Sequence, residues 1–285
     1  LNRCIQRSHS RSARGCPGDR CMTVSHMSGA GNRFLVIDDR EDQLFADVMT
    51  PGQISDLFAK YARTDEAPFE GLLRVRSIDI SHCSTDFYNP DGSRGMLCGN
   101  GARCAVRHAV DHGASPNGTL SCMFNGTTYT ARFYDDSTVG IILPTPAQVR
   151  YFPIGTLENV TIPVWYVDVH SDHVVIEAPH DAGNPYIGML RHHADFPRGV
   201  NVNMAEMISD DTIRLATFER GVEAITQACG TGAVSTAVTM WMHDPSITRF
   251  TIVPPSGREL VVTIFANAGH IDSIELRGDA VYDHP

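Results

Sequence analysis

Lysine is nearly absent from this chain: Lys60 is the single lysine among 23 basic residues, and the other 22 are arginines. Enzymes that work through pyridoxal phosphate or a Schiff base need a lysine at the reacting centre. Lys60 falls in the segment 53–63, where apolar residues recur at helical spacing, so we expect it on the solvent side of a helix. Lysine-based chemistry is therefore disfavoured, and we predict that the protein uses no cofactor.

Long apolar runs are missing too. No stretch approaches the ~20 apolar residues that a membrane-spanning helix needs. Acidic residues outnumber basic ones by 33 to 23, which gives a net charge of −10. Because phosphates and anionic lipids attract clustered cations, nucleic-acid and membrane partners are disfavoured. We predict a small-molecule ligand, leave a homodimer open, and expect about two domains from the length of 285 residues.

The first 21 residues lack an apolar run, and they carry five arginines against a single acid. A secretory signal needs an apolar core segment, so this segment is not one. We expect a disordered basic tail over residues 1–21, either an organelle transit peptide or translated sequence upstream of Met22. The expected location is the cytoplasm, or a plastid or other organelle if the tail is a transit peptide.

Metal-binding cysteine spacing is absent as well. Beyond residue 21 the chain has five cysteines, an odd number, and none of them belongs to a Cys-x-x-Cys pair. This pattern disfavours a disulfide framework and a zinc site, and it favours a reducing compartment. We therefore predict no metal.

Short runs of β-branched and aromatic residues bounded by turn formers predict strands. The expected strands are 34–38, 162–169, 173–177, 213–218, 249–253 and 259–265. The TPGQ sequence at 50–53 combines a cap residue, a proline and a glutamine three after the cap, which predicts that a helix over 53–63 begins here. The predicted fold class is α/β of the mixed, α+β kind.

The proline-rich residues 143–146 mark a break between two halves of the chain. We place an N-terminal domain at 22–143 together with 273–285, and a C-terminal domain at 144–272.

An internal sequence repeat is the most informative feature. Residues 98–102, CGNGA, and residues 229–233, CGTGA, differ at one position, and each segment leads into a run rich in alanine and valine. The runs are too evenly apolar for surface helices, so each predicts a buried helix that begins at the glycines. The repeat predicts a duplicated domain, with one central helix in each copy.

A cysteine at a helix start has a definite chemistry. The first turn leaves N–H groups unpaired and carries about half a positive charge, which favours a bound anion and lowers a thiol pKa. Two such cysteines suit the inversion of an amino-acid α-carbon, in which a base removes a proton from one face and an acid delivers one to the other. For Cys83, Cys104 and Cys122 we expect core packing instead.

Seven motifs follow one another along the chain: SHMSGAGNRFLVID, NPDGSRGMLCGNGARC, AGNPY, FPRGVN, FERG, TQACGTGA and PPSGREL. In content and order they resemble the motifs of the diaminopimelate epimerase family, a cofactor-independent, two-cysteine family of lysine and cell-wall biosynthesis. The resemblance implies two pseudo-symmetric domains, each a curled mixed sheet around a central buried helix, with substrate between them. It implies an isomerase acting on LL- and meso-diaminopimelate.

The resemblance also implies site residues. Cys98 and Cys229 would be the acid/base pair, assisted by Glu219. The backbone N–H groups of Gly99, Asn100, Gly230 and Thr231 would hold the α-carboxylate. The rest of the substrate would contact Asn32, Asn89, Asn184, Asn201, Glu219 and Arg220, of which Arg220 can clamp a second carboxylate.

Four departures from the family pattern concern the substrate more than the reaction. Tyr186 stands where the family's Gly-Asn-Pro-His has a histidine that supports the first cysteine, and Arg33 and Ile225 replace acidic residues. Gly71 replaces a glutamine expected on a loop that covers the substrate. Two alternatives therefore stay open: a related racemase or epimerase of another amino acid, and a non-catalytic binding protein on the same fold.

Overall fold

The computed structural model describes residues 23–283 except 42–43, 46, 63–66, 96, 115–117 and 180. The predicted basic tail lies outside the described residues. The chain divides into two compact units: unit 1 ends at Ile141 and takes up the chain again from Asp279, and unit 2 comprises Ile142–Gly278. The domain boundaries that we predicted, 22–143 with 273–285 and 144–272, remain a proposal.

Unit 1 is built on one mixed sheet whose strands pair in the order β17-β1-β2-β3-β4-β5-β6. The β2–β3 and β4–β5 pairs are parallel, and the others are antiparallel. The strands are β1 (Thr23–Gly29), β2 (Asn32–Asp38), β3 (Gly71–Ile78), β4 (His82–Tyr88), β5 (Leu120–Phe124), β6 (Thr127–Phe133) and β17 (Val281–Tyr282). Strand β7 (Val139–Leu143) spans the point at which unit 1 ends.

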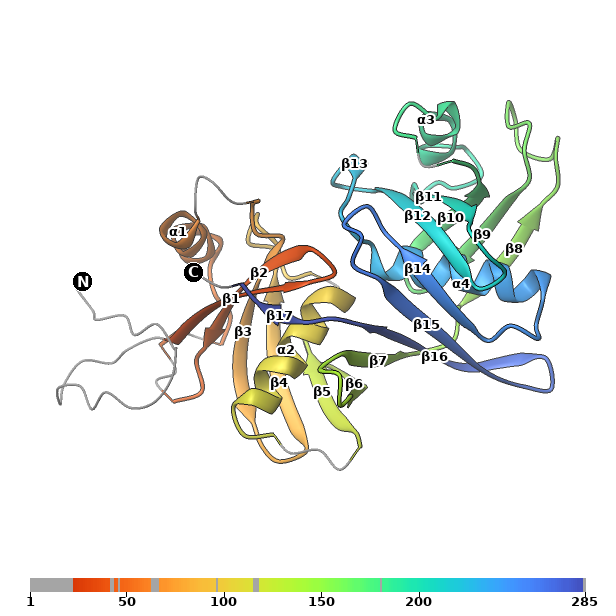
Figure 1. The fold of residues 1–285 in the computed structure, drawn as a ribbon. Coiled ribbons are helices and arrows are strands. Elements are labelled where there is room, and N and C mark those ends of the chain that lie inside the picture. Colours follow the sequence, from red (N-terminus) through yellow and green to blue (C-terminus); the bar gives the residue numbers. More distant parts are fainter. Residues whose placement is uncertain are drawn as a thin grey trace, which may run out of the picture. The chain divides into compact units, whose positions relative to one another are not determined.

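Two helices make the parallel crossovers of unit 1. Helix α1 (Pro51–Tyr61) joins β2 to β3 and buries Ile54 and Leu57 in a cluster with residues of both strands. Helix α2 (Gly99–Asp111) joins β4 to β5 and packs against the strands from β1 to β6, across the inner face of the curled sheet (Figure 1). Its first three turns are almost wholly buried, so α2 is the central helix of this unit.

Unit 2 repeats this plan. Its strands pair in the order β8-β9-β10-β11-β12-β14-β15-β16, and only β10–β11 and β12–β14 are parallel. The bounds are β8 (Gln148–Phe152), β9 (Val164–Asp168), β10 (Asp172–Glu177), β11 (Asn201–Met207), β12 (Thr212–Glu219), β14 (Arg249–Val253), β15 (Leu260–Asn267) and β16 (His270–Gly278). The two-residue β13 (Ala224–Ile225) pairs with the end of β12.

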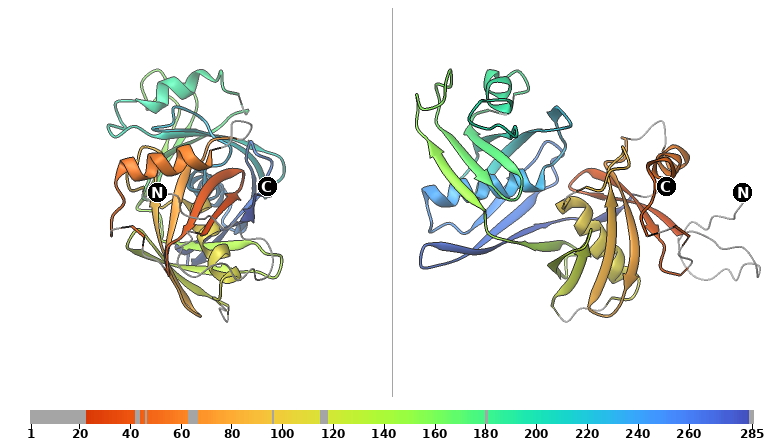
Figure 2. Two further views of the ribbon diagram at one scale, coloured as in Figure 1. Left: turned by 90° about the vertical axis from the view of Figure 1, so that its left-hand side faces the viewer. Right: turned by 180° about the vertical axis from the view of Figure 1, so that it is seen from behind.

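The parallel crossovers of unit 2 again contain helices. Helix α3 (Pro185–Arg191) joins β10 to β11, and α4 (Gly230–His243) joins β12 to β14. Eleven residues of α4 are buried, and the helix runs inside the curl of its sheet (Figure 2). Both units thus contain the order strand pair, helix, strand pair, central helix, strand pair, and unit 2 adds β8, β13 and β16 to it. The predicted mixed class and the pseudo-symmetric pair of domains are confirmed.

The individual elements follow the sequence pattern closely. Each of the six predicted strands coincides with an observed strand to within two residues at either end. Helix α1 begins at Pro51 with the predicted capping box, in which the Gln53 N–H donates to the Thr50 side chain and the Thr50 N–H donates to Oε1 of Gln53. Lys60 is exposed, as predicted.

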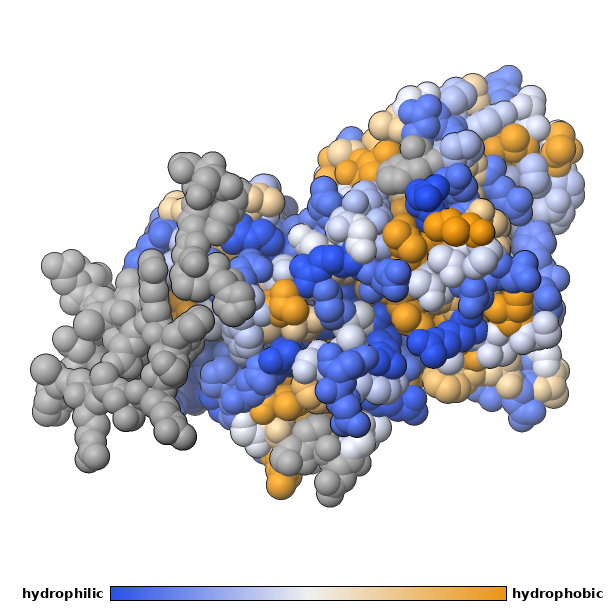
Figure 3. Space-filling model, in the orientation of Figure 1, coloured by the Kyte–Doolittle hydropathy of each residue, from blue (hydrophilic) through white to orange (hydrophobic). Residues whose placement is uncertain are grey.

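The described surface and core have ordinary features. Polar residues cover most of the face drawn in Figure 3, and hydrophobic ones form small separate groups. Cys83, Cys104 and Cys122 are fully buried, which confirms that they pack in the core. No helix among the described residues is long and apolar enough to cross a membrane, and the same residues contain no group of three or more His, Cys, Asp or Glu side chains placed to hold a metal ion.

Candidate active site

The two copies of the repeated motif lie at equivalent places in the two units. Cys98 is the N-cap residue of α2, and Cys229 is the N-cap residue of α4. Both cysteines have extended backbone, and both are half-buried. The Cys98 carbonyl accepts from the Ala102 N–H at 2.8 Å, and the Cys229 carbonyl accepts from the Ala233 N–H at 2.9 Å. The predicted start of each central helix directly after its cysteine is confirmed.

In unit 1 the start of α2 lies against the turn between β1 and β2. Asn100 is buried, and its Oδ1 accepts from Nη2 of Arg103 at 2.8 Å. Gly29, the last residue of β1, lies so close to this turn of the helix that a Cβ atom would be 2.8 Å from the Asn100 carbonyl oxygen. Because even a Cβ would clash with this backbone, glycine is needed at position 29 for α2 to pack on β1. Gly99 is half-buried at the first helical position.

The other predicted site residues of unit 1 flank this region. Asn32, the first residue of β2, is buried, and its Nδ2 donates to Oε2 of Glu70 at 3.2 Å. Asn89 follows β4 directly, and its Nδ2 donates to Oγ of Ser93 at 2.9 Å. Both asparagines lie at strand ends in the unit that contains Cys98. Each of these strand ends therefore carries an amide side chain.

In unit 2 the Cys229 sulfur is held by the first turn of α4. The Gly232 N–H donates to Sγ at 3.4 Å, and the Thr231 hydroxyl lies 3.5 Å from Sγ. Gly232 is tightly packed, since a Cβ there would be 2.5 Å from Oδ1 of Asn203 and 2.6 Å from Oγ1 of Thr217. Gly230 is buried and Thr231 is half-buried. The helix start is thus fixed against β11 and β12.

Glu219, the last residue of β12, contacts Cys229. Its carboxylate accepts from the Thr226 hydroxyl and shares a hydrogen bond with the Cys229 thiol. Burial raises the pKa of Glu219. Burial and the charge of Glu219 together hold the pKa of Cys229 well above its usual range, although the Thr231 hydroxyl and the Gly232 N–H act in the opposite direction.

This result corrects the expectation that the helix start lowers the thiol pKa. At Cys229 the burial of the thiol, and then the negative charge of Glu219 beside it, outweigh the partial positive charge of the helix end and raise the pKa. Near neutral pH Cys229 is a thiol, able to donate a proton, and Glu219 is the group beside it that could accept one.

Asn201, the first residue of β11, and Arg220, which directly follows β12, are neighbours. Oδ1 of Asn201 accepts from the Arg220 N–H at 2.8 Å. The Arg220 Nη1 donates to the carbonyls of Arg198 and Gly199 at 2.8 and 2.9 Å, and it lies 3.3 Å from Oδ2 of Asp172. Its contacts with the described residues therefore tether the guanidinium through one terminal nitrogen, Nη1.

His173 is a buried residue that the sequence reasoning passed over. Its ring lies between Asn201 and Asn203, with Nε2 3.4 Å from Nδ2 of Asn201 and Nδ1 3.1 Å from Nδ2 of Asn203. Asn203 accepts in turn from Thr217. Burial lowers the pKa of His173 to about 3, so the ring is neutral. The available signal was the polar HSDH run at 170–173, which directly precedes a strongly apolar strand.

Asn184 and Tyr186 lie in a different setting from the other predicted site residues. Asn184 is the N-cap residue of α3 and accepts from the Tyr186 N–H at 3.0 Å. The Tyr186 hydroxyl lies 2.6 Å from Oγ1 of Thr161, and its ring packs against a hydrophobic cluster of unit 2. The structure thus gives Asn184 a capping contact, and its predicted contact with substrate stays a prediction.

The remaining departures have local explanations. Gly71 is the first residue of β3 rather than part of a loop, and a Cβ there would be 2.1 Å from the Phe87 ring. Arg33 forms an ion pair of 2.9 Å with Asp283 and lies over the Phe69 ring. Ile225 lies in β13 and packs against the same hydrophobic cluster as Tyr186. These three residues therefore stabilise their own unit.

Solved structures with this doubled fold include a phenazine biosynthesis protein of the PhzF family from Bacillus anthracis, with a TM-score of 0.68 at 12% identity over 92% of this chain and 96% of that one. A hydroxyproline epimerase from Agrobacterium vitis has a TM-score of 0.57 at 14% identity, over 92% and 91% of the two chains. The fold is therefore one on which amino-acid epimerases are built.

Sequence relatives narrow the class. The sequence model of the diaminopimelate epimerase family matches residues 24–147 and 169–282. Diaminopimelate epimerases from Chlorobaculum tepidum and Aquifex aeolicus are 33% and 30% identical, over 74% and 76% of this chain and 80% of each relative. The chain belongs to the diaminopimelate epimerase family, and it is an isomerase of the amino-acid epimerase class.

Proposed function

We propose that this protein interconverts LL- and meso-diaminopimelate, as a step of lysine biosynthesis, through acid/base chemistry at Cys98 and Cys229 without a cofactor. The observation that carries the proposal is the equivalence of the two helix starts. In each unit a half-buried cysteine caps the central helix, and glycine and small polar residues follow it. Family membership supplies the substrate class.

The proposed reaction moves one proton off the α-carbon and one proton onto it. The thiolate of one cysteine removes the α-proton and becomes a thiol, while the thiol of the other donates its proton to the opposite face and becomes a thiolate. The raised pKa of Cys229 suits it to the donor role in one direction. In the other direction Cys229 starts as the thiolate and Cys98 as the thiol: Glu219, which shares a hydrogen bond with the Cys229 thiol, accepts the Cys229 proton, and Cys98 takes up a proton from solvent before it donates to the α-carbon.

The substrate would be held by its charged ends. In the proposal the N–H groups of Gly99, Asn100, Gly230 and Thr231 bind the reacting α-carboxylate, because first-turn N–H groups attract anions. Arg220 and Asn201 bind the distal carboxylate, with the amides of Asn32 and Asn89.

We further propose that His173, rather than Tyr186, corresponds to the histidine of the family motif. Its ring contacts the amides of Asn201 and Asn203, whereas the Tyr186 hydroxyl contacts Thr161. A neutral imidazole in this position would fix the orientation of Asn201. The homodimer, the cytoplasmic location and the absence of a metal also stay predictions.

Incubation with LL-diaminopimelate in deuterated water tests the proposed function. We expect deuterium at the α-carbon and the appearance of the meso form, since each proton delivered comes from an exchangeable thiol. Exchange with a different amino acid but not with diaminopimelate would replace the substrate and keep the reaction. The absence of exchange with any amino acid tested, together with tight binding of one, would favour a binding protein.

A further inference from the structure

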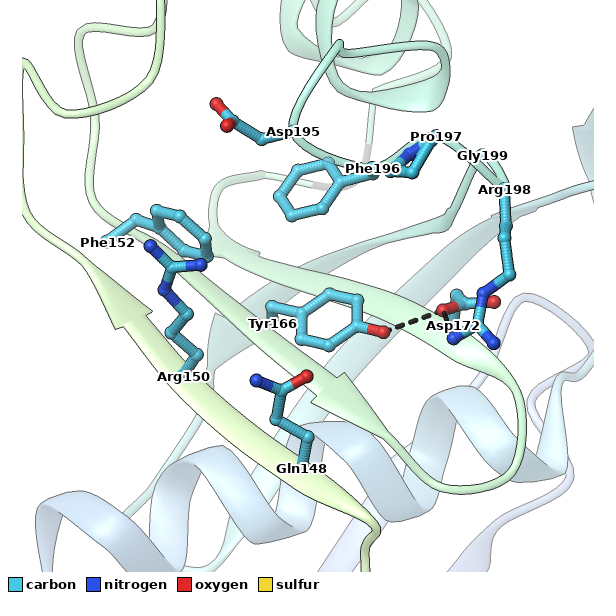
Figure 4. Close-up of a pocket in the computed structure, with 10 residues that line it drawn as sticks. All are labelled: Gln148, Arg150, Phe152, Tyr166, Asp172, Asp195, Phe196, Pro197, Arg198 and Gly199. Carbon is cyan, nitrogen blue, oxygen red and sulfur yellow. Dashed lines mark hydrogen bonds and ion pairs between the residues drawn. The ribbon is translucent and has the colours of Figure 1, made fainter.

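One carboxylate, that of Asp172 at the start of β10, is shared by three side chains. Oδ1 of Asp172 accepts from the Tyr166 hydroxyl and from Nη2 of Arg198, each at 2.6 Å, and Oδ2 lies 3.3 Å from Nη1 of Arg220. Figure 4 shows Arg198 and Tyr166 converging on Asp172 at one end of a pocket of about 190 Å³. The Asp172 side chain is 9% exposed, and that of Arg198 is 67% exposed.

The arrangement fixes the direction of Arg220. Its Nη1 points at Asp172 and at the carbonyls of Arg198 and Gly199, so this nitrogen is committed to the protein. An arginine held by one terminal nitrogen keeps its orientation while its remaining N–H groups can form a bidentate pair with a carboxylate. Asp172 therefore orients the residue that we expect to bind the distal carboxylate.

The same carboxylate also creates an electrostatic problem. A negative charge beside Arg220 weakens the attraction of Arg220 for a second carboxylate. Arg198 offsets that charge and is itself within 3.3 Å of Asp168. The four groups Asp168, Asp172, Arg198 and Arg220 sum to zero, and without Arg198 they sum to −1. Hydrogen bonds from Tyr166 and Arg198 outweigh burial and keep the pKa of Asp172 low, so its charge is permanent near neutral pH.

We propose that Asp172 is a positioning residue for Arg220, and that Arg198 keeps this end of the site able to bind a carboxylate by neutralising Asp172. The inference rests on the proposed function in that it assigns Arg220 to a substrate carboxylate. It adds two residues, neither of which touches the reacting atoms, that set the preference for a dicarboxylate substrate.

A double-mutant cycle that removes the Arg198 charge and then the Asp172 charge tests the proposal. We expect Arg198→Ala to raise KM for LL-diaminopimelate by about tenfold with kcat nearly unchanged, because the loss falls on binding of the non-reacting end. Adding Asp172→Asn in the same chain returns the four-group sum to zero while the amide oxygen can still accept from Nη1 of Arg220, so the double variant should recover KM to within about threefold of the wild type. A purely structural role for Arg198 would not be rescued by removing a second charged group.

The matched control is Arg150→Ala. Arg150 lines the same pocket and lies over the Phe152 ring at 4.3 Å, so its removal changes the net charge by the same amount without removing a partner of Asp172. KM should change by less than about twofold. Equal effects of the two alanine variants, or no recovery in the double variant, would overturn the proposal.

A readout that needs no turnover separates this inference from the proposed function. Titration with glutarate, a plain dicarboxylate, should shift the NMR signal of the Arg220 Nε–H group. Its dissociation constant should rise about tenfold in Arg198→Ala and recover in the double variant. If the dissociation constants rank in this way but diaminopimelate gains no α-deuterium, the inference stands and the proposed function is refuted. An Arg220 signal that does not respond to glutarate, or that responds equally in all variants, would refute the inference whatever the activity.

Discussion

At the scale of single residues, the contact between Glu219 and Cys229 is the most consequential one in the site. The sequence placed Cys229 at a helix start, where a thiolate is favoured, but the fold adds a carboxylate beside it and encloses both groups. Two acidic groups that share one hydrogen bond do not readily both ionise. The pair therefore holds one proton near neutrality, and the thiol carries it.

Replacing Glu219 with glutamine should lower the pKa of Cys229, because the negative charge that raises it is gone while the hydrogen-bonding shape is kept. In a Cys98→Ser background the pH midpoint for alkylation of Cys229 by iodoacetamide should fall by about one unit. The epimerase activity should drop at the same time, since the proton acceptor is lost. A midpoint that stays in place or rises would refute the assigned coupling.

Whether the role of a site residue could be predicted depends on how far along the chain its interaction partners lie. The repeated motif and the family resemblance predicted that Cys98 and Cys229 lie at helix starts. A helix start is a local property of the chain. The raised pKa of Cys229 depends on burial and on Glu219, ten residues away, and it was predicted in the wrong direction. His173 was missed because its importance comes from Asn201 and Asn203, which reach it only through the parallel pairing of β10 with β11.

At the scale of elements, the two central helices share a motif but differ in how their first turns are seated. Gly101 of α2 faces side-chain ends, since a Cβ there would be 3.3 Å from Leu73 Cδ2 and from Phe34 Cε1. Gly232 of α4 faces the polar atoms of Asn203 and Thr217 at 2.5 and 2.6 Å, and these two residues hydrogen-bond to each other. The α4 start has less room to adjust.

The pair Gly232→Ala and Gly101→Ala tests this difference. We expect Gly232→Ala to lower kcat by at least about tenfold in a folded protein, because a small displacement of the α4 start moves Cys229 away from Glu219. Gly101→Ala should cost less than about threefold, since the Leu73 and Phe34 side chains can shift. Circular dichroism on both variants checks the fold. A larger loss in Gly101→Ala would contradict the packing argument.

Element prediction succeeded where burial makes the pattern strong. Strands such as β10 and β14 carry unbroken apolar or alternating runs, and α1 carries a complete capping box. Strand β6, with four of its seven residues polar, and the seven-residue α3 were not predicted. The buried strands β3 and β11, whose apolar runs are interrupted by Arg74 and by Asn203, were not predicted either. An exposed strand is set by its partner in the sheet, and the NPY sequence at 184–186 serves equally well as a turn or as a capped helix start.

At the scale of the whole molecule, the duplicated topology explains why a cysteine stands at the start of a central helix twice. Each unit places its cysteine where the central helix leaves the strand pair, at β4 in unit 1 and at β12 in unit 2. The sequence repeat was sufficient to predict this duplication, because both copies carry the same motif at the start of the central helix. It did not predict that the start of α4 packs on the polar side chains of Asn203 and Thr217, whereas Gly101 of α2 packs on the apolar side chains of Leu73 and Phe34.

Acid should destabilise the protein through His173. Its folded pKa of about 3 lies below the usual value of 6.5, so between these values the unfolded chain binds more protons and stability falls as the pH falls. Between pH 7 and pH 5 the wild type should lose about 2 kcal/mol more unfolding free energy than His173→Gln. Urea unfolding at the two pH values measures this. His270→Gln, at an exposed position, is the control and should leave the pH dependence nearly unchanged.

The central claim is that two cysteines share the inversion of one carbon, and it is tested most directly by α-deuteration and epimerisation of LL-diaminopimelate in single-cysteine variants. We predict that Cys98→Ser and Cys229→Ser each lose epimerisation by at least about a hundredfold, because an alcohol is a far weaker acid than a thiol. The buried Cys104→Ala should keep most of the activity. Retention of near wild-type epimerisation by either serine variant, in a folded protein, would contradict the account.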